Sequence, residues 1–349
     1  MQTVTGRSAS PPRIVVFGVG NYGQEFARLA RIKGWPIVAA LNRAGDKVGQ
    51  DLSVLAGLPE ANGVIVQDCS TANVSALDAD VGVVFTTDSL GANLPAYEQL
   101  LNAGLDVVCH GLQSYYPFRY DPETAGRLDA IARANGKTFT GTGIWDMSRI
   151  WAGILLAGPS VSIRSLTHYS VTQVNYPHPG LIATFGLDLT PEEYVANFVR
   201  TPGSVEDYGL AGKYQTIPEQ VLTALGYHVT GGREVQEPVT SEEPVFCKAL
   251  QRDIEPGRVV GWRYRSTIET LEGVPAESRM DMRLLRDDEI EHMVWEIDGL
   301  PRNRLVIERK DSISASAASV LNRIPDVIAA EPGIQLLSQL GPMRPSFPL

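Results

Sequence analysis

Three glycines near the amino terminus have the spacing of a phosphate-binding turn. They follow directly on the apolar run Ile14–Phe17, in the order Gly-Val-Gly-Asn-Tyr-Gly, and the apolar spacing after them indicates a helix. In such a unit the first glycine permits a tight turn, the second lets backbone amides approach a pyrophosphate, and the third lets helix and strand pack closely. The sequence therefore predicts a dinucleotide site. The contacts that we expect are Gly18, Gly20, Asn21, Tyr22 and Gly23.

The residues after the second expected strand, Ile37–Leu41, favour NADPH as the cofactor. NAD-selective sites usually place an aspartate or glutamate about 20 residues beyond the glycines, whereas this chain has Asn42 and Arg43, with Lys47 nearby. A carboxylate would repel a 2'-phosphate, but Asn42 can donate a hydrogen bond to it and Arg43 can form a charge-assisted contact. The alternatives are NADH as the cofactor and a solvated loop arginine at position 43.

Polar residues follow two further expected strands at the same edge of the sheet. Thr86 and Thr87 follow the strand 81–85, and the loop 110–117 follows the strand 105–109. Because ligands of such sheets sit beyond the carboxyl ends of the strands, the two threonines are predicted to contact the nicotinamide-side ribose or phosphate. The alternative is that they form an ordinary polar helix start.

Hydride transfer to a C=O or C=N bond needs a dry, close placement of the acceptor carbon and one proton donor. Candidates for this donor lie on the loop after Cys109 and on or just after a strand expected over Ile163–Tyr176. The catalytic candidates are Gln113, Tyr115, Tyr176 and His178. The alternatives are that Tyr115 is an interface aromatic and that His178, which stands between two prolines, is a turn residue.

Other residues are expected to form the wall of a substrate pocket, since pockets for small ligands are mostly hydrophobic. These pocket residues are His110, Trp145, Met147 and His168. Asp146 is either the N-cap of the helix that follows or a carboxylate that enters the site, and we favour the cap. No histidine or cysteine pair has the spacing of a zinc site, so no metal is expected.

Composition and charge argue against several classes of protein. The chain has 349 residues, of which 44% are hydrophobic and 20% charged, and this suits a globular protein of two domains. A formal charge of -10 without a lysine or arginine run argues against nucleic acid or an anionic membrane as a partner. No apolar stretch approaches the ~20 residues of a membrane span. Residues 1–12 indicate a flexible polar tail and no signal peptide, so a cytoplasmic location is expected.

The order of expected strands and helices predicts two domains. Residues 13–145 alternate short buried strands with helices, which is typical of an α/β Rossmann domain with a parallel sheet. Residues 146–310 have longer strands of an open, mostly antiparallel sheet and form an α+β domain, in which capping boxes at Thr190 and Thr216 start two helices. The helical segment 311–349, broken at Pro325, is expected to pack back on the Rossmann domain.

An ordered series of motifs resembles the dihydrodipicolinate-reductase-like oxidoreductases. These motifs are Val15–Gly23, Lys47–Leu52, Gly141–Ile144 and Ala315–Ala330. Within that group the likeness is greatest to the native amine dehydrogenases and the 2,4-diaminopentanoate dehydrogenases, and it spans nearly the whole chain. The resemblance implies a homodimeric reductase with a nicotinamide cofactor. It also implies that the second domain pairs its open sheet between protomers and receives the substrate in a cleft.

Two departures from the family pattern bear on the substrate. The region 168–184 has no lysine or arginine where the lysine-pathway reductases bind a dicarboxylate, so a small neutral carbonyl, imine or amine is expected. The amine dehydrogenases carry a glutamate, which handles the proton of ammonia, before a Tyr-Pro pair. The loop before Tyr116-Pro117 has no carboxylate here, and Gln113 stands near the position of that glutamate. The leading hypothesis is NADPH-dependent reductive amination, and the alternatives are carbonyl reduction without ammonia and a non-catalytic NADPH-binding dimer.

Overall fold

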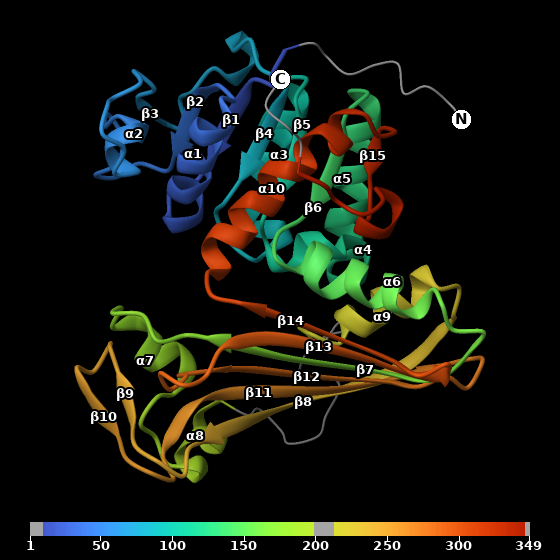
Figure 1. Ribbon diagram of the computed structural model, residues 1–349. Helices are drawn as coiled ribbons and strands as arrows, with labels where there is room; N and C mark the ends of the chain where they lie inside the picture. Colours follow the sequence, from blue (N-terminus) through green and yellow to red (C-terminus); the bar gives the residue numbers. More distant parts are fainter. Residues whose placement is uncertain (1–9, 199–212, 346–349) are drawn as a thin grey trace. The chain divides into compact units, whose positions relative to one another are not determined.

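The computed structural model describes residues 10–198 and 213–345, which form two compact units (Figure 1). The first unit contains the residues up to Met147 together with those from Asp311 onward, and the second unit is Ser148–Lys310. The chain therefore leaves the first unit and returns to it with its C-terminal segment, as the sequence predicted. Most of the expected tail, residues 1–12, lies outside the described residues.

A parallel sheet forms the centre of the first unit. Its strands are β1 (Ile14–Phe17), β2 (Ile37–Asn42), β3 (Val66–Asp68), β4 (Val81–Val84), β5 (Asp106–Cys109), β6 (Thr138–Gly141) and β15 (Gly333–Ile334). They lie in the order β15-β6-β5-β4-β1-β2-β3, and every neighbouring pair is parallel. Strands β1, β4 and β5 are buried along their whole length, as expected when both faces are covered. The strand order changes direction between β1 and β4, where sheets of this kind bind ligands.

Helices cover both faces of this sheet (Figure 1). They are α1 (Asn21–Lys33), α2 (Leu52–Leu55), α3 (Leu90–Asn102), α4 (Pro117–Tyr120), α5 (Pro122–Ala134) and α10 (Ser312–Ile328). On one face α1 and α10 pack against each other and bury Phe26 and Val320 against the strands. On the other face α3 and α5 bury Tyr97 and Leu128. The predicted Rossmann domain is therefore confirmed.

The predicted break at Pro325 is wrong, because α10 continues to Ile328. A proline inside a helix gives up one backbone hydrogen bond. Beyond it, however, Val327 is fully buried in the core, and the amide of Ala329 still bonds to the Pro325 carbonyl (3.2 Å). The apolar face of the helix thus extends past the proline, and its burial outweighs the lost bond.

The second unit contains an open sheet. Its strands are β7 (Ser162–Gln173), β8 (Val229–Thr240), β11 (Val259–Thr270), β12 (Ala276–Arg283), β13 (Glu291–Leu300) and β14 (Asn303–Arg309). They lie in the order β14-β13-β7-β12-β11-β8, and all neighbouring pairs are antiparallel except β7 with β12. A separate hairpin joins β9 (Val245–Cys247) to β10 (Arg252–Ile254). The predicted antiparallel sheet is confirmed.

Helices also pack against this second sheet. A π-helical turn at Asp146–Trp151 leads into α6 (Ala152–Ala157), and α7 (Gly180–Phe185), α8 (Pro191–Phe198) and α9 (Thr216–Ala224) follow. Helix α6 contacts β13 and β14, and α9 contacts β7, β8 and β12. The covered face is lined by buried side chains such as Trp295. The opposite face carries paired charges, among them Arg263, Arg279 and Asp281.

One of the two predicted capping boxes is present. Thr190 Oγ1 accepts from the Glu193 amide (3.2 Å), and Glu193 Oε2 accepts from the Thr190 amide (2.8 Å), at the start of α8. The second predicted box is wrong, because Thr216 is already helical. Instead, the carboxylate of Glu234 on β8 accepts from the backbone amides of residues 213–215. A carboxylate from a distant strand thus replaces the local cap.

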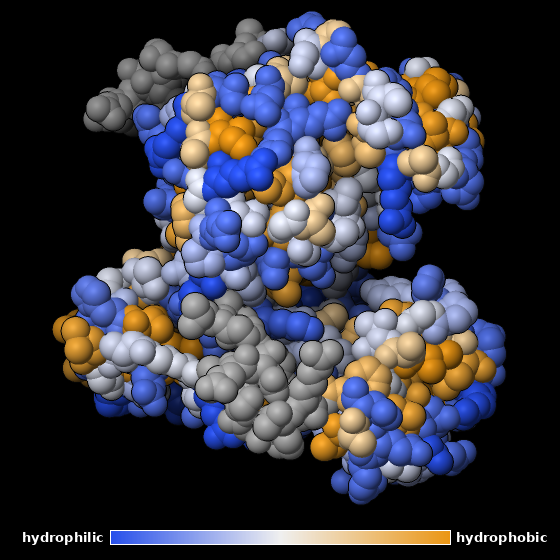
Figure 2. Space-filling view, turned by 180° about the vertical axis from the view of Figure 1, so that it is seen from behind, coloured by the Kyte–Doolittle hydropathy of each residue, from blue (hydrophilic) through white to orange (hydrophobic). Residues whose placement is uncertain are grey.

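Three further observations concern the surface, the helices and the possible metal ligands of the described residues. Figure 2 shows hydrophilic and hydrophobic residues interspersed over one face of the molecule. Among the helices of residues 10–198 and 213–345, none is long and apolar enough to cross a membrane. Within the same ranges, no three histidine, cysteine, aspartate or glutamate side chains come together in a group that could hold a metal ion.

Candidate active site

The glycine loop lies between β1 and α1, and its three glycines have different surroundings. Gly18 has a φ of +100°, and a Cβ there would lie 2.6 Å from the Phe85 carbonyl oxygen. A Cβ on Gly23 would collide with the Gly18 carbonyl, but a Cβ on Gly20 would meet nothing within 4 Å. Gly20 is also the N-cap of α1, where no side chain caps the helix. The open space and the uncapped helix end fit the pyrophosphate of a dinucleotide.

The residues after β2 brace this loop and leave one cation exposed. Asn42 Oδ1 accepts from the Val19 amide (3.2 Å), and Lys47 Nζ donates to the Val19 carbonyl (2.6 Å). Two of the predicted cofactor contacts therefore hold the loop itself in place. Arg43 is exposed, and its carbonyl accepts from Asn42 Nδ2 (3.1 Å), while no described residue pairs with its guanidinium. Its guanidinium is the group here best suited to a phosphate.

Thr86 and Thr87 are exposed at the end of β4, next to β1 in the sheet. Both hydroxyls donate to Oδ1 of Asn93, in the first turns of α3. The sequence analysis did not single out Asn93. The sequence does contain a signal for Asn93, because it is a polar residue on the buried side of a helix, seven positions after Thr86.

Four predicted residues come together at the carboxyl edge of the first sheet. The ring of His110 packs on that of Tyr22, with 4.3 Å between centroids, and the ring of Tyr115 packs on that of Trp145 at 5.1 Å. Gly143 lies where these two pairs meet. A Cβ there would lie 2.5 Å from His110 Cδ2 and would collide with Tyr115 Oη. The cluster therefore requires a glycine at position 143. The sequence analysis placed Gly143 in the Gly141–Ile144 motif but did not assign it this role.

His110 is neutral at physiological pH. Burial lowers its pKa to about 4, although the nearby charge of Asp88 opposes the shift. A neutral imidazole offers one donor and one acceptor. His110 can therefore orient a polar group in this cluster through a hydrogen bond. It is not an imidazolium that could donate a proton as an acid.

Gln113 connects two loops at this edge. Its side-chain oxygen Oε1 accepts from the backbone amide of Leu90 at the start of α3 (2.8 Å), and its backbone amide donates to the Asp88 carbonyl (3.0 Å). These bonds give Gln113 a structural role. Its catalytic role stays a prediction.

Asp146 is not the predicted cap, because it is already the first residue of the π-helical turn. It is fully buried, and its carboxylate accepts two hydrogen bonds from Arg323 (2.8 and 2.6 Å) and one from Thr142 Oγ1 (2.7 Å). Both oxygens of the carboxylate are therefore already bonded within the first unit. The nearby pocket candidate Met147 is partly buried, and its sulfur contacts the amide of Met343 (3.2 Å).

The remaining candidates lie in the second unit. Tyr176 and His178 are exposed, and His178 Nδ1 accepts from the Gly180 amide (3.1 Å), which matches the alternative of a turn residue. The pocket role of His168 is wrong, because this residue is fully buried in the core. It bonds to Ser278 Oγ through Nδ1 (2.9 Å) and packs on Trp295, and burial holds its pKa well below the usual range.

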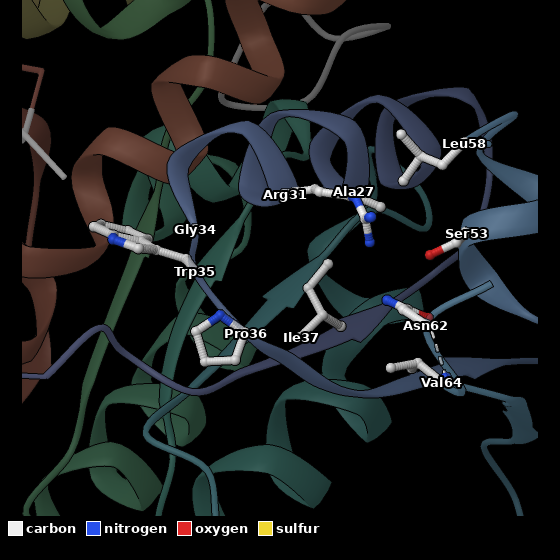
Figure 3. Close-up of a pocket in the computed structure, with 10 residues that line it drawn as sticks. All are labelled: Ala27, Arg31, Gly34, Trp35, Pro36, Ile37, Ser53, Leu58, Asn62 and Val64. Atoms are coloured by element: carbon white, nitrogen blue, oxygen red, sulfur yellow. Dashed lines mark hydrogen bonds between the residues drawn. The ribbon is translucent and has the colours of Figure 1, made fainter. Parts of the chain in front are cut away.

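A surface pocket in the first unit lies away from these residues (Figure 3). Trp35, Pro36 and Ile37 at the start of β2 line it, together with Arg31 of α1 and residues near α2. The glycine loop lies at the other end of these strands, since β1 runs parallel to β2 and leads into the loop. No predicted site residue lines this pocket.

Comparison with known proteins finds dehydrogenases both among curated sequences and among solved structures. No protein-family model matches the chain. The chain is similar to the 2,4-diaminopentanoate dehydrogenase of Acetoanaerobium sticklandii, with 23% identity over 342 residues, 94% of this chain and 93% of the relative. It is also similar to the solved structure of an amine dehydrogenase from Mycobacterium smegmatis, with 28% identity, a TM-score of 0.86, and coverage of 97% of this chain and 98% of the other.

More distant structures share the fold alone. A biliverdin reductase from Synechocystis, solved with biliverdin and NADP+, has a TM-score of 0.52 and 14% identity over 86% of this chain and 80% of its own. A scyllo-inositol dehydrogenase from Lactobacillus casei, solved with NAD(H), has a TM-score of 0.53 and 18% identity over 85% and 76%. Fold and comparisons together identify an oxidoreductase of the Rossmann type. The resemblance to the amine dehydrogenases and diaminopentanoate dehydrogenases, inferred from the motifs, is confirmed.

Proposed function

We propose that this protein is an NADPH-dependent oxidoreductase of the amine-dehydrogenase-like group, which reduces the C=N bond formed from a small ketone or aldehyde and ammonia. The observation that carries the proposal is the similarity to an amine dehydrogenase over 97% of the chain, with a TM-score of 0.86. The motifs Val15–Gly23 and Ala315–Ala330 further support a place in the wider dihydrodipicolinate-reductase-like group.

The glycine loop supports a nicotinamide cofactor, because Gly20 leaves open space at the uncapped start of α1. Such a cofactor, when bound and reduced, supplies a hydride to the substrate carbon. NADPH is favoured over NADH because Asn42 and the exposed Arg43 stand where NAD-selective proteins carry a carboxylate. A guanidinium pairs well with a phosphate, whereas it gains little from a ribose hydroxyl.

Tyr115 and His110 are the proposed polar groups beside the reacting bond. Tyr115 Oη and the imidazole edge of His110 both adjoin the Cβ position that Gly143 leaves empty. The phenol can donate a hydrogen bond, and the neutral imidazole can donate or accept one. Together they would orient the substrate nitrogen or oxygen. A protonated imine takes up hydride without a stronger acid, so two neutral donors suffice for this step. Tyr176 and His178 stay candidates from the second unit.

Carbonyl reduction without ammonia is the second candidate function. Making an imine from a ketone and ammonia requires a group that takes a proton from the attacking nitrogen and returns one to the hydroxyl that leaves as water. The loop before Tyr116-Pro117 supplies no carboxylate, and the carboxylate of Asp146 is held by Arg323. A ketone reduced directly to an alcohol needs only the hydride and one proton.

The test is the rate of NADPH oxidation with small neutral ketones and aldehydes, each with and without excess ammonium at alkaline pH. Turnover that requires ammonium and yields a primary amine supports the proposal. Equal turnover without ammonium, with an alcohol as the product, selects the carbonyl reductase. Binding of NADPH with no turnover of any substrate would select the non-catalytic dimer.

We further propose a homodimer that forms through the open face of the second sheet. Helices α6 and α9 pack on the other face, and the open face carries charges that are already paired, such as Asp281 with Arg263 and Arg279. Paired charges can be buried at an interface at lower cost than single ones. Light scattering should give twice the 37.9 kDa of one chain, and a monomer would contradict the proposal.

A further inference from the structure

The side chain of Asn93 binds both threonines at the end of β4. Asn93 is buried, with 3% of its surface exposed. Its Oδ1 accepts from Thr86 Oγ1 (2.5 Å) and Thr87 Oγ1 (3.1 Å). Its Nδ2 donates to the Thr87 carbonyl (2.8 Å) and to Tyr97 Oη (3.0 Å). The oxygen and the nitrogen of the amide therefore each have two protein partners.

The carbonyl of Thr87 determines which way this amide points. A carbonyl oxygen only accepts hydrogen bonds, so the Asn93 atom beside it is the nitrogen, and Oδ1 faces the two hydroxyls. Because Oδ1 also only accepts, each threonine hydroxyl directs its single proton inward to Asn93. Thr87 Oγ1 in addition accepts from the Ser89 amide (3.3 Å). The outer sides of both hydroxyls are left with lone pairs only.

The hydrogen bonds continue beyond Asn93 into the core. Tyr97 Oη accepts from Asn93 Nδ2 and lies 2.8 Å from Cys109 Sγ, where either the phenol or the thiol can donate. Burial raises the pKa of Tyr97 well above its usual value and that of the Cys109 thiol to about 11. Both groups therefore keep their protons at neutral pH, and Asn93 is held among neutral partners.

We propose that Asn93 is a positioning residue that makes Thr86 and Thr87 hydrogen-bond acceptors for the ribose hydroxyls or the carboxamide N–H groups of a nicotinamide cofactor. The inference rests on the proposed function, because it takes that cofactor as the ligand. A phosphate presents acceptor oxygens, which would face the lone pairs of the threonines without a proton between them. Hydroxyl and amide groups present the proton that is missing there.

The test compares the affinities of three ligands for the full-length protein by calorimetry. NADPH carries both kinds of donor, 2'-phospho-ADP-ribose carries the second ribose without the carboxamide, and 2',5'-ADP carries neither. The variants are Asn93→Leu and the exposed pair Thr86→Val with Thr87→Val, which keeps the proposal testable if the buried substitution impairs folding. Asn102→Leu at the exposed end of α3 is the control, since the side chain of Asn102 accepts from Asn135 Nδ2 and bonds to neither threonine.

Both test variants should bind NADPH about tenfold more weakly, which corresponds to the loss of one or two hydrogen bonds. They should bind 2',5'-ADP as the wild type does. An equal loss for 2'-phospho-ADP-ribose assigns the contact to the ribose, and no loss for it assigns the contact to the carboxamide. Unchanged NADPH affinity, or an equal loss for 2',5'-ADP, overturns the inference while the proposed function stands. A wild type that binds none of the three ligands overturns both.

Discussion

Arg323 and Asp146 form a bidentate ion pair in which both side chains are fully buried, with Nε–Oδ2 at 2.8 Å and Nη2–Oδ1 at 2.6 Å. Arg323 lies on α10, and Asp146 follows β6 in the same unit. Burial raises the pKa of Asp146, and Arg323 opposes that shift. The pair fastens the C-terminal helix to the segment that leads out of the parallel sheet.

Replacing Arg323 by methionine should lower the free energy of unfolding by about 3–5 kcal/mol, because the carboxylate of Asp146 would be left buried without its partner. Urea unfolding of the two proteins measures the difference. The control is Arg164→Met, which breaks the exposed ion pair with Asp298 and should leave the free energy of unfolding nearly unchanged. If both variants lose the same small amount, the buried pair contributes no more than a surface contact.

Two of the three glycines of the loop should respond differently to alanine. Gly18→Ala should unfold at a lower temperature, since its φ of +100° and the Phe85 carbonyl at 2.6 Å leave no room for a Cβ. Gly20→Ala should keep the wild-type melting temperature, because nothing lies within 4 Å of its Cβ, and yet bind NADPH at least about tenfold more weakly. Melting and calorimetry separate the two effects. Full NADPH affinity in folded Gly20→Ala would exclude the loop as the pyrophosphate site.

Arg43→Ala should weaken the binding of NADPH by about tenfold or more and leave the binding of NADH unchanged, because only NADPH carries the 2'-phosphate. The affinities of both cofactors are measured for each protein. Arg31→Ala is the matched control, as Arg31 is another arginine of this unit but lines the pocket of Figure 3 and pairs with Glu60. Parallel losses for NADPH and NADH would assign Arg43 a role in folding and not in cofactor choice.

The parallel sheet could be predicted because its information is local. Strands such as Ile14–Phe17 are short apolar runs, and the helices between them have apolar residues at helical spacing. Since the carboxyl ends of parallel strands share an edge, Tyr22, His110 and Tyr115 could be expected there before their contacts were known. Local pattern therefore sufficed for the architecture and for the neighbourhood of the site.

Contacts between distant segments could not be predicted in the same way. Asp146 and Arg323 are 177 positions apart, and no periodicity links them. The alternation along β7 assigns His168 to one face of the strand but does not say that helices cover that face. Similarly, the cap of α9 comes from Glu234 on another strand and not from the Thr216 sequence beside it. These errors share one cause, which is a tertiary partner that overrides a local signal.

His110 should make the protein less stable as the pH falls from about 6.5 to 4. Burial lowers its pKa in the folded protein to about 4, so over this range the unfolded chain binds a proton that the folded protein does not. The loss reaches at most about 3 kcal/mol at the acid end. His110→Gln removes this titration, so the difference in unfolding free energy between variant and wild type should shift in favour of the variant between pH 7 and pH 4.5. His178→Gln, at an exposed turn, is the control. A difference for His110→Gln that is constant with pH would mean that His110 titrates alike in both states.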